Sequence, residues 1–270
     1  MSTQITMTRK PVSVEPTQDG NETSRGMVRQ STCLKAASWV VAVFLLAILT
    51  YRLLPDFDLA IDRLFSSATD PFPAQGREIW QLVRGFMIGM TDGSIAVIII
   101  WMSLATIIPR LQIVRQEVFG FVVLTYAAVP GLLVNGVIKP YWGRARPRNI
   151  IDFGGSALFS PPLEISHQCG GSCSFVSGEA SALFTMATLI ILIFVPSLPA
   201  RLQKPAIIVT GAVAALGSGL RVIVGAHFVS DVVFAALLST GITLMLYMLV
   251  GLNRFGSPFI IRKNLKKCLR

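Results

Sequence analysis

The 270-residue sequence predicts an all-α, polytopic membrane protein built as a bundle of six transmembrane helices. Hydrophobic residues make up 53% of the chain and charged residues only 14%, whereas soluble proteins carry about 25% charged residues. The charges are also clustered, so they leave long uncharged runs between them. A helix needs about 20 apolar residues to cross a bilayer, and these runs approach or reach that length.

Six apolar runs are the predicted spans. The third and the sixth reach membrane length without a charge, and the fourth is uncharged but short. The first, second and fifth each carry a charge near one end, at Arg52, Asp92 and Arg221. A mixed stretch, residues 57–80, has room for a short surface helix. The predicted spans are Ala36–Leu54, Gly89–Ile108, Val118–Ile138, Ala180–Val195, Pro205–Val224 and Val232–Leu252.

Polar or basic segments flank the spans and divide the chain into three parts. Residues 1–35 predict a disordered cytoplasmic tail, residues 36–252 the helical domain, and residues 253–270 a basic cytoplasmic tail. The first span is apolar enough for a signal peptide, but Arg52 and Pro55 follow it where a small-residue cleavage site would stand. The span is therefore expected to stay as an anchor.

The distribution of Lys and Arg predicts which side of the membrane each loop faces. With both termini inside, most of the 24 Lys and Arg residues fall in cytoplasmic segments, as the positive-inside rule requires. The three motifs described below then face outward. A basic inner rim beside anionic lipid accounts for most of the net charge of +10, so the expected partner is the lipid bilayer and not a nucleic acid.

The four cysteines divide between the two sides of the membrane. Cys33 and Cys268 fall in cytoplasmic segments and are expected as free thiols. Cys169 and Cys173 lie in the large outer loop, where an oxidising compartment favours a disulfide between them. A metal site is the rival interpretation, but His167 is the only nearby histidine, so no metal is expected.

The first motif follows the third span. It runs from Lys139 to Pro147 and brings Arg144 and Arg146 close to that lysine. Pro140 and Pro147 interrupt helices, so the motif is expected on an irregular segment at the membrane surface. A phosphate needs several cationic donors at once, because its charge is spread over its oxygens. Snorkelling to lipid headgroups explains any one of these cations, but not their number on the side that the positive-inside rule depletes.

The second motif precedes the fourth span and has the form of a helix start. Ser174 and Ser177 stand just before the apolar run, and Ser177-Gly178 is a favourable capping sequence. The amides at a helix N-terminus attract anions, so Ser177 and Gly178 are candidate phosphate ligands. Glu179 lies in the first turn, where an acidic residue also suits an ordinary helix. Taken alone, this motif indicates no more than a capped helix.

The third motif joins the fifth and sixth spans. Arg221 ends one span, His227 lies near the start of the next, and Asp231 follows His227 by four residues. On a helix, that spacing places His227 and Asp231 on one face. A carboxylate bonded to one ring nitrogen fixes the tautomer and leaves the other nitrogen free to attack phosphorus. An isolated histidine would be interpreted as an interfacial residue, but ionisable groups at membrane depth are usually functional.

Together the three motifs resemble the signature of the type 2 phosphatidic acid phosphatase superfamily. The matching residues are Lys139, Arg146 and Pro147 in the first motif, Ser177 and Gly178 in the second, and Arg221, His227 and Asp231 in the third. Their order and spacing are conventional, and the resemblance covers about residues 36–252. The first and third motifs are specific, whereas the middle one is weak by itself.

The resemblance implies a helical-bundle phosphatase with an outward-facing active site. The phosphate ligands that it implies are Lys139, Arg146, Arg221, Ser177 and Gly178. It also implies that His227 is the nucleophile, that Asp231 orients it, and that the reaction passes through a phosphohistidine without a metal or other cofactor.

The chain departs from the family pattern in two motifs. The family usually has Pro-Ser-Gly-His in the middle motif, where this chain has Val176-Ser177-Gly178-Glu179, and Leu220 replaces the serine that usually precedes the arginine of the third motif. The family has a histidine after Ser-Gly, assigned to protonating the leaving group, and this chain has Glu179. Glu179 is an expected proton donor if its environment raises its pKa from about 4.3, and His167 on the same loop is a second candidate. A leaving group that needs little protonation, such as a diphosphate, is a third solution. The spacing of the first motif assigns Lys139 and Arg146 to the phosphate and not Arg144. Arg144 is therefore expected to contact the rest of the headgroup.

The resemblance, together with the predicted orientation, implies a phosphoric monoester hydrolase that acts on a lipid in a bacterial inner membrane, with its site facing the periplasm. The elaborate loop from Asn149 to Cys173 has room to shape a pocket for a large headgroup, which favours the 4'-phosphate of lipid A. Undecaprenyl diphosphate, phosphatidate and phosphatidylglycerol phosphate are alternative substrates. A protein that binds or transports lipid phosphate without turnover is the rival class. The sequence leaves the oligomeric state and the organism open.

Overall fold

The computed structural model describes residues 27–67, 69–254 and 258–259, and six of its helical segments are long and apolar enough to cross a membrane. This result confirms the predicted fold class. Four of the segments are single helices, α1 (Gln30–Leu53), α3 (Glu78–Ile107), α7 (Ala200–Ile223) and α8 (Val229–Val250). The other two begin with α4 (Gln116–Tyr126) and α6 (Gly178–Ile193).

The predicted division into two tails and a helical domain stays a prediction, because most of both tails lies outside the described residues. Helix α1 starts at Gln30, six residues before the predicted span, and the rest of the N-terminal tail lies almost wholly outside the described residues. Most of the C-terminal tail, with Cys268, also lies outside them. Cys33 is a free, buried thiol, as expected.

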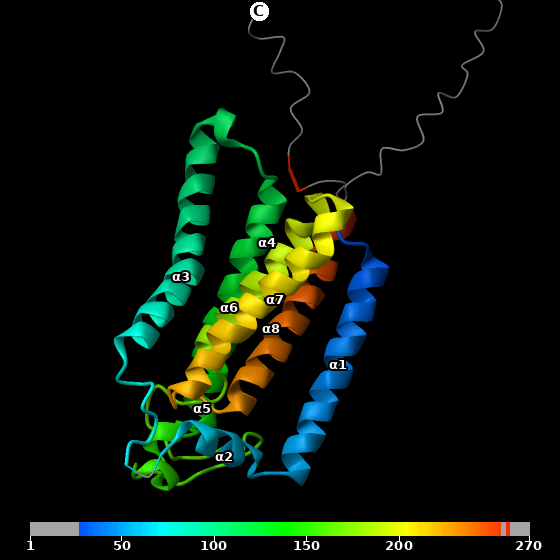
Figure 1. Ribbon diagram of the computed structural model, residues 1–270. Helices are drawn as coiled ribbons and strands as arrows, with labels where there is room; N and C mark the ends of the chain where they lie inside the picture. Colours follow the sequence, from blue (N-terminus) through cyan, green and yellow to red (C-terminus); the bar gives the residue numbers. More distant parts are fainter. Residues whose placement is uncertain (1–26, 68, 255–257, 260–270) are drawn as a thin grey trace, which may run out of the picture.

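Helix α6 lies in the middle of the bundle. It packs against α7 and α8 over most of its length and also contacts α3 and α4 (Figure 1). Helix α1 packs along α8 on one side of the bundle, and α3 stands on the opposite side. Many large apolar side chains of α1 and α3 are exposed, which is the pattern expected where a helix faces lipid.

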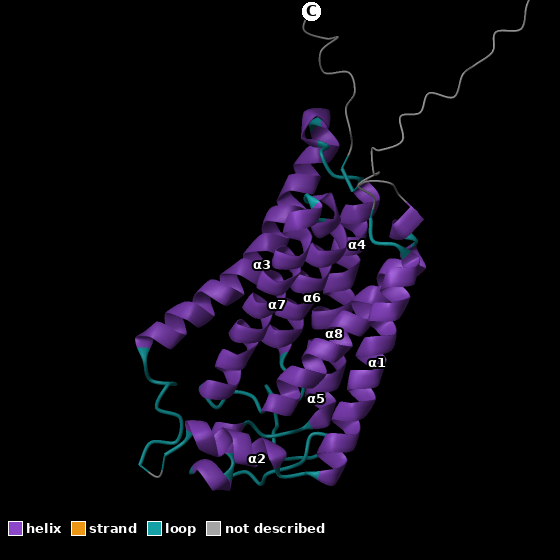
Figure 2. Cartoon of the chain, turned by 45° about the vertical axis from the view of Figure 1, so that its right-hand side comes forward, coloured by secondary structure: helices purple, strands orange, loops and turns teal. Residues whose placement is uncertain are grey.

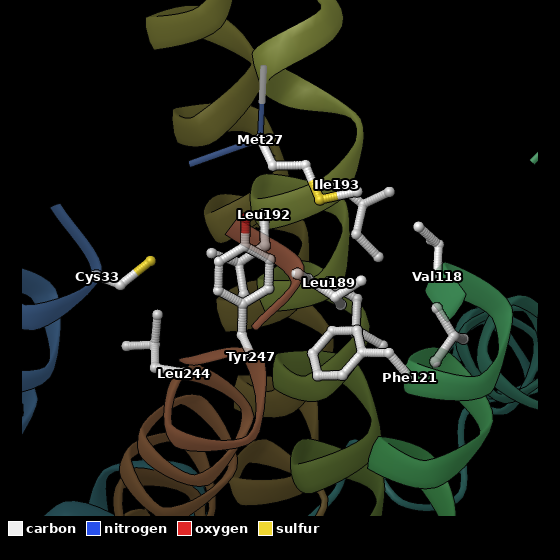
Figure 3. Packing of buried hydrophobic residues seen from close by; sticks show 11 residues of the cluster. Met27, Cys33, Val118, Phe121, Leu189, Leu192, Ile193, Leu244 and Tyr247 are labelled. Carbon is white, nitrogen blue, oxygen red and sulfur yellow. The ribbon is translucent and has the colours of Figure 1, made fainter. Parts of the chain in front are cut away.

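The two ends of the bundle differ. The loops, with the short helices α2 (Phe57–Asp62) and α5 (Lys139–Trp142), gather at one end (Figure 2). The chain enters α1 and leaves α8 at the other end (Figure 1). There, apolar side chains of α1, α4, α6 and α8 pack together, and Phe121 meets the ring of Tyr247 at 5.9 Å between centroids (Figure 3). This packing fixes the helices at the end away from the motifs.

The third span is longer and less regular than predicted. After α4 the chain continues through a π-helical segment, Ala127–Ile138, and then through α5. Lys139 therefore lies on a helix, and its expected place on an irregular segment was wrong. The helix tolerates Pro140 because the preceding turns are wide, with the Lys139 N–H bonded to the carbonyl of Val134, five residues back.

Gly143 ends this long segment. Its φ of 63° is in the left-handed region, and a Cβ built there would lie 1.7 Å from the carbonyl oxygen of Ser166. Only glycine fits so close to the outer loop. The turn sends Arg144 and Arg146 away from the helix, and the backbone of Arg146 is extended, as the motif predicted.

The second span also begins earlier than predicted. Helix α3 starts at Glu78 rather than near Gly89, so it includes Arg84 as well as Asp92. These polar side chains are compatible with the span because both line a cavity inside the bundle. Helix α2 confirms that the mixed stretch 57–80 holds a short helix.

Candidate active site

A cavity of about 760 Å³ opens between α3, the α4 segment and α6. Its polar end lies near the loop end of the bundle and brings the three motifs together. The predicted site residues that line it are Lys139, Arg146, Gly178, Glu179, Arg221 and His227. Ser177 and Asp231 are fully buried and do not line the cavity. The three motifs therefore form one site, as their chemistry suggested, although they are far apart in the chain.

His227 and Asp231 face each other, but not in the way that their spacing predicted. Helix α8 begins at Val229, so His227 precedes the helix and the two residues do not share a helix face. The reason is that the Asp231 carboxylate accepts a hydrogen bond of 2.9 Å from the Phe228 backbone N–H and starts the helix there. His227 Nδ1 lies 3.5 Å from Asp231 Oδ2, which is longer than an ordinary hydrogen bond.

The environment of His227 keeps its imidazole neutral. The ring is only 2% exposed, and this burial lowers its pKa to about 4. The carboxylate of Asp231 opposes the shift, whereas the positive charges of Lys139 and Arg221 add to it. A histidine with this pKa has a free ring nitrogen at neutral pH, which is the form that acts as a nucleophile.

Arg144 holds Asp231 from behind. Its guanidinium is fully buried, with Nη1 2.7 Å from Asp231 Oδ1 and Nη2 2.8 Å from Asp58 Oδ2. The Nε atom donates to the carbonyl of Ser160, and the group stacks over the Phe228 ring at 4.0 Å. The expected headgroup contact of Arg144 was therefore wrong, because two carboxylates draw this side chain into the protein interior.

The two serines of the second motif have structural partners. The Ser174 hydroxyl donates to Asp231 Oδ2, and the Ser177 backbone N–H donates to the Asp231 carbonyl at 3.1 Å. The Ser177 hydroxyl accepts from the Ala180 N–H at 3.3 Å, so Ser177 is the N-cap of α6. The capped-helix interpretation is therefore confirmed, and the same cap fixes the position of α6 against Asp231.

Gly178 is required where α6 meets the third span. A Cβ at this position would lie 2.6 Å from Asn135 Oδ1, inside the contact distance of real side chains. Asn135 itself is held by a hydrogen bond of 2.7 Å from its side chain to the Pro130 carbonyl, and it lines the cavity beside Gly178. The close approach brings the N-terminus of α6 to the cavity wall.

Glu179 lies between two arginines. Arg84 Nη2 is 2.9 Å from Glu179 Oε1, and Arg221 Nε is 3.2 Å from Glu179 Oε2. The carboxylate therefore aims both guanidinium groups toward the cavity. The sequence interpretation missed Arg84, because the predicted span began after it. The sequence did contain one indication. Arg84 is one of the basic residues on the predicted outer side, where the positive-inside rule expects few.

Lys139 and Arg146 complete the ring of cations. Arg146 donates from Nε to the Ser172 carbonyl at 3.0 Å and from Nη2 to the Ser172 hydroxyl at 2.8 Å. The Lys139 side chain has no hydrogen bond or ion pair with another described residue. Its ammonium therefore has all of its donors available for a ligand, and a neutral serine orients Arg146 for the same purpose.

The outer loop is closed by a disulfide between Cys169 and Cys173, whose Cα atoms are 5.5 Å apart. The predicted pairing is confirmed. His167, on the same loop, is exposed and does not line the cavity. Within the part of the chain that the structure describes, no cluster of His, Cys, Asp and Glu has the size of a metal site.

The inner part of the cavity is an apolar groove between α3 and the third span. The polar side chains in it are Thr91, Asp92 and Tyr126. Its apolar lining residues are Ile88, Ile95 and Ile99 from α3 and Val123, Ala127, Pro130 and Gly131 from the third span. An apolar groove that leads from a ring of cations suits a molecule with a phosphate at one end and hydrocarbon at the other.

Comparison with known proteins agrees with this geometry. The family model of the PAP2 superfamily matches residues 119–255, which is half of the chain. A lipid A 4'-phosphatase of Francisella tularensis subsp. novicida (strain U112) is 36% identical over 155 residues, covering 57% of this chain and 68% of that protein. Lipid A 4'-phosphatases of Rhizobium leguminosarum and Rhizobium etli are each 40% identical, and the matches cover 45% and 44% of those proteins.

One solved structure is similar in outline. The crystal structure of a transmembrane PAP2 type phosphatidylglycerolphosphate phosphatase from Bacillus subtilis is 24% identical to this chain. The match covers 78% of this chain and 93% of that one, with a TM-score of 0.47.

Proposed function

Since this chain belongs to the PAP2 superfamily and is a multi-pass bacterial membrane lipid phosphatase, we propose that it removes the 4'-phosphate of lipid A. One observation carries the proposal. The cations around His227 lie at one end of a single cavity, and the rest of that cavity is a mostly apolar groove between membrane-spanning helices, in which Thr91, Asp92 and Tyr126 are the polar side chains. A lipid can place its phosphate on the cations while its chains stay in the groove.

In this proposal, three cations bind the phosphate. Lys139 and Arg146 approach from the end of the third span, and Arg221 approaches from the end of α7. The α6 N-terminus contributes through the Gly178 amide, which Ser177 positions as the helix cap. Together these groups neutralise the charge on the phosphate oxygens, which is the main requirement of phosphoryl transfer.

The reaction proceeds in two displacements. The neutral ring of His227 attacks phosphorus through its free nitrogen, and the bond from phosphorus to the sugar oxygen breaks. The phosphohistidine carries a positive ring, and the Asp231 carboxylate at 3.5 Å stabilises that charge. A water molecule then attacks the phosphohistidine, releases inorganic phosphate and restores the neutral imidazole.

We assign the proton for the leaving oxygen to Glu179 rather than to His167. Glu179 lines the cavity, whereas His167 does not. Glu179 is paired with Arg84 and Arg221. When a phosphate oxygen takes over the guanidinium group of Arg221, the carboxyl group can carry the proton that the sugar oxygen needs.

The proposed location is a bacterial inner membrane, with both termini in the cytoplasm and the site facing the periplasm. The site lies at the end of the bundle opposite to the start of α1 and the end of α8 (Figure 1). The disulfide between Cys169 and Cys173 lies at the site end, and disulfides persist in oxidising compartments such as the periplasm.

The decisive experiment uses the purified protein in detergent with four lipids. These are lipid A carrying only the 4'-phosphate, lipid A carrying only the 1-phosphate, undecaprenyl diphosphate and phosphatidate. We expect phosphate release mainly from the first lipid, and no release by His227→Ala. Equal or faster release from another lipid would overturn the substrate assignment. Release by His227→Ala at the wild-type rate would overturn the nucleophile.

A further inference from the structure

A second, smaller cavity of about 110 Å³ adjoins the first. The two share Arg84, Arg146 and Arg221, so they lie side by side around the same guanidinium groups. The second cavity also has polar side chains of its own, from Arg148 and from Gln75 and Gln81. None of these three residues belongs to the motifs that bind the phosphate.

The second cavity carries a surplus of positive charge. Four arginines line it, and the one carboxylate that pairs with any of them among the described residues is Glu179. Glu179 pairs with Arg84 and Arg221, while Arg146 bonds the neutral Ser172. Arg148 has no ion pair or side-chain hydrogen bond with a described residue. Like charges that line one small cavity repel each other, so an anion bound there would stabilise the arrangement.

Hydrogen bonds hold two parts of the cavity wall in place, one at the buried Gly225 and one on the exposed start of α3. Arg148 follows Pro147 in a single helical turn, and its backbone N–H donates to the Gly225 carbonyl at 3.1 Å. The Gln81 side chain donates to the Gln75 carbonyl at 2.9 Å. Gln75 precedes α3 and Gln81 lies near its start, so the second cavity is at the loop end of the bundle, away from the apolar groove.

We propose that the second cavity binds a second acidic group of the substrate, a phosphate or carboxylate carried on the headgroup beside the phosphate that is removed. Arg148 is its dedicated ligand, and the side-chain amides of Gln75 and Gln81 are neutral donors around it. The inference rests on the proposed function, because it needs a phosphate in the first cavity. It adds a preference that the motifs do not contain: of two lipids with the same sugar headgroup, the one with an acidic group beside the phosphate that is removed is bound more tightly.

The test compares two soluble anions that the enzyme does not turn over. Methylenediphosphonate carries two joined anionic groups, and inorganic phosphate carries one. Binding is measured by calorimetry on the full-length protein in detergent, so that no turnover is needed. We expect the wild type to bind methylenediphosphonate about tenfold more tightly than phosphate, the factor typical of one additional charge-assisted bond.

The informative variant is Arg148→Gln, and Arg77→Gln is its matched control. Arg77 is exposed at the same end of the molecule and lines neither cavity. We expect Arg148→Gln to bind phosphate like the wild type but to lose the tenfold advantage of the diphosphonate, and Arg77→Gln to keep it. An Arg148→Gln protein that retains the advantage overturns the proposal. If the wild type binds neither anion, the phosphate site itself fails, which is a different result.

Two further measurements separate the sources of the second anion. A lipid with an acidic group beside its phosphate should show a higher KM with Arg148→Gln, and a lipid that lacks this group should not. Nanodiscs of anionic or zwitterionic phospholipid test the other source, the bulk membrane surface. If Arg148→Gln weakens only the preference for anionic nanodiscs, Arg148 is a membrane contact and the proposal is wrong.

Discussion

Arg144 Nη1 lies 2.7 Å from Asp231 Oδ1, and both side chains are completely buried. The other carboxylate oxygen of Asp231 faces His227, so the buried guanidinium fixes the carboxylate from the side opposite to the histidine. Asp58 holds Arg144 in turn, with 2.8 Å between Oδ2 and Nη2. The position of the proposed nucleophile therefore depends on a chain of charges that begins on α2.

The first prediction concerns Arg144→Gln. The substitution leaves the buried carboxylates of Asp58 and Asp231 without their cation, and breaking a buried pair typically costs about 3–5 kcal/mol. We expect a marked fall in the unfolding temperature in detergent and a loss of phosphate release. In the double variant Arg144→Gln/Asp58→Asn, one of the two charges is gone, so part of the lost stability should return. Wild-type stability of the single variant would contradict the role given to this pair.

The Arg144 network shows where sequence interpretation stops. Hydropathy predicted the six spans because a bilayer needs long apolar helices, whatever their partners. The partners of Arg144 could not be predicted, because Asp58 lies 86 residues before it and Asp231 lies 87 residues after it. No local pattern specifies which of several neighbouring arginines turns inward. The spacing excluded Arg144 from the phosphate ligands, but it did not reveal the buried partners.

The sequence predicted that the helices exist better than it predicted where they begin and end. Lys139, Arg221 and His227 were assigned to one site because their chemistry is complementary, and they do line one cavity. Their local geometry depended on details that composition does not contain. The π-helical segment extends the third span past Pro140, and Asp231 caps α8 so that His227 stays outside the helix. Arg84 was missed because an early helix start is invisible in hydropathy.

The second prediction concerns the ionisation of His227. Burial lowers the pKa of its ring to about 4, so the ring should remain neutral from pH 8 down to pH 5. The chain has two histidines, so the variant His167→Gln leaves one signal in the NMR spectrum of protein labelled with ¹⁵N-histidine. We expect that signal to keep its neutral shifts over this range. Half-protonation near pH 6.5, the value of an ordinary imidazole, would contradict the burial argument.

The third prediction concerns Asp62, at the end of α2. Both of its carboxyl oxygens are buried and have no hydrogen-bond partner among the described residues, and burial raises its pKa to about 9. The nearby carboxylates of Asp58 and Asp231 act in the same direction. The folded protein therefore binds one more proton than the unfolded chain between about pH 4 and pH 9.

Stability that depends on this proton is lost as the pH rises through that window. Asp62→Asn has the same shape and no proton to lose, so it should be more stable than the wild type at pH 8. The difference should shrink by about 1.4 kcal/mol for each pH unit on the way down to pH 4. Unfolding temperatures of both proteins across pH provide the measurement. A constant difference would show that Asp62 is ionised in the folded protein.

The fourth prediction separates Glu179 from His167 as the proton donor. Glu179→Gln should slow the formation of the phosphohistidine on the lipid substrate by roughly 100-fold, the usual contribution of a general acid, and His167→Gln should leave it unchanged. An aryl phosphate with a good leaving group needs no proton. With that substrate, the defect of Glu179→Gln should largely disappear in rapid-quench measurements. An equal defect on both substrates would assign Glu179 to the positioning of Arg84 and Arg221 instead.

The last prediction concerns the apolar groove. Ala127 lines it where the third span becomes π-helical, so Ala127→Phe places a ring in the space proposed for a hydrocarbon chain. The polar end, with Lys139 and His227, should stay as it is. We therefore expect kcat/KM to fall about tenfold or more on the long-chain lipid, a loss of roughly 1.4 kcal/mol in transition-state stabilisation, and to stay unchanged on a short, water-soluble phosphate ester.

Leu132→Phe is the matched control, because Leu132 lies in the same π-helical segment but is 66% exposed and does not line the cavity. It adds the same ring on the lipid-facing side, so it should retain full activity on both substrates. If Ala127→Phe lowers both activities equally, the ring has disturbed the phosphate site and the groove is not specific for chains. If Ala127→Phe lowers neither activity, the hydrocarbon chains bind elsewhere. The groove then no longer supports a lipid as the substrate.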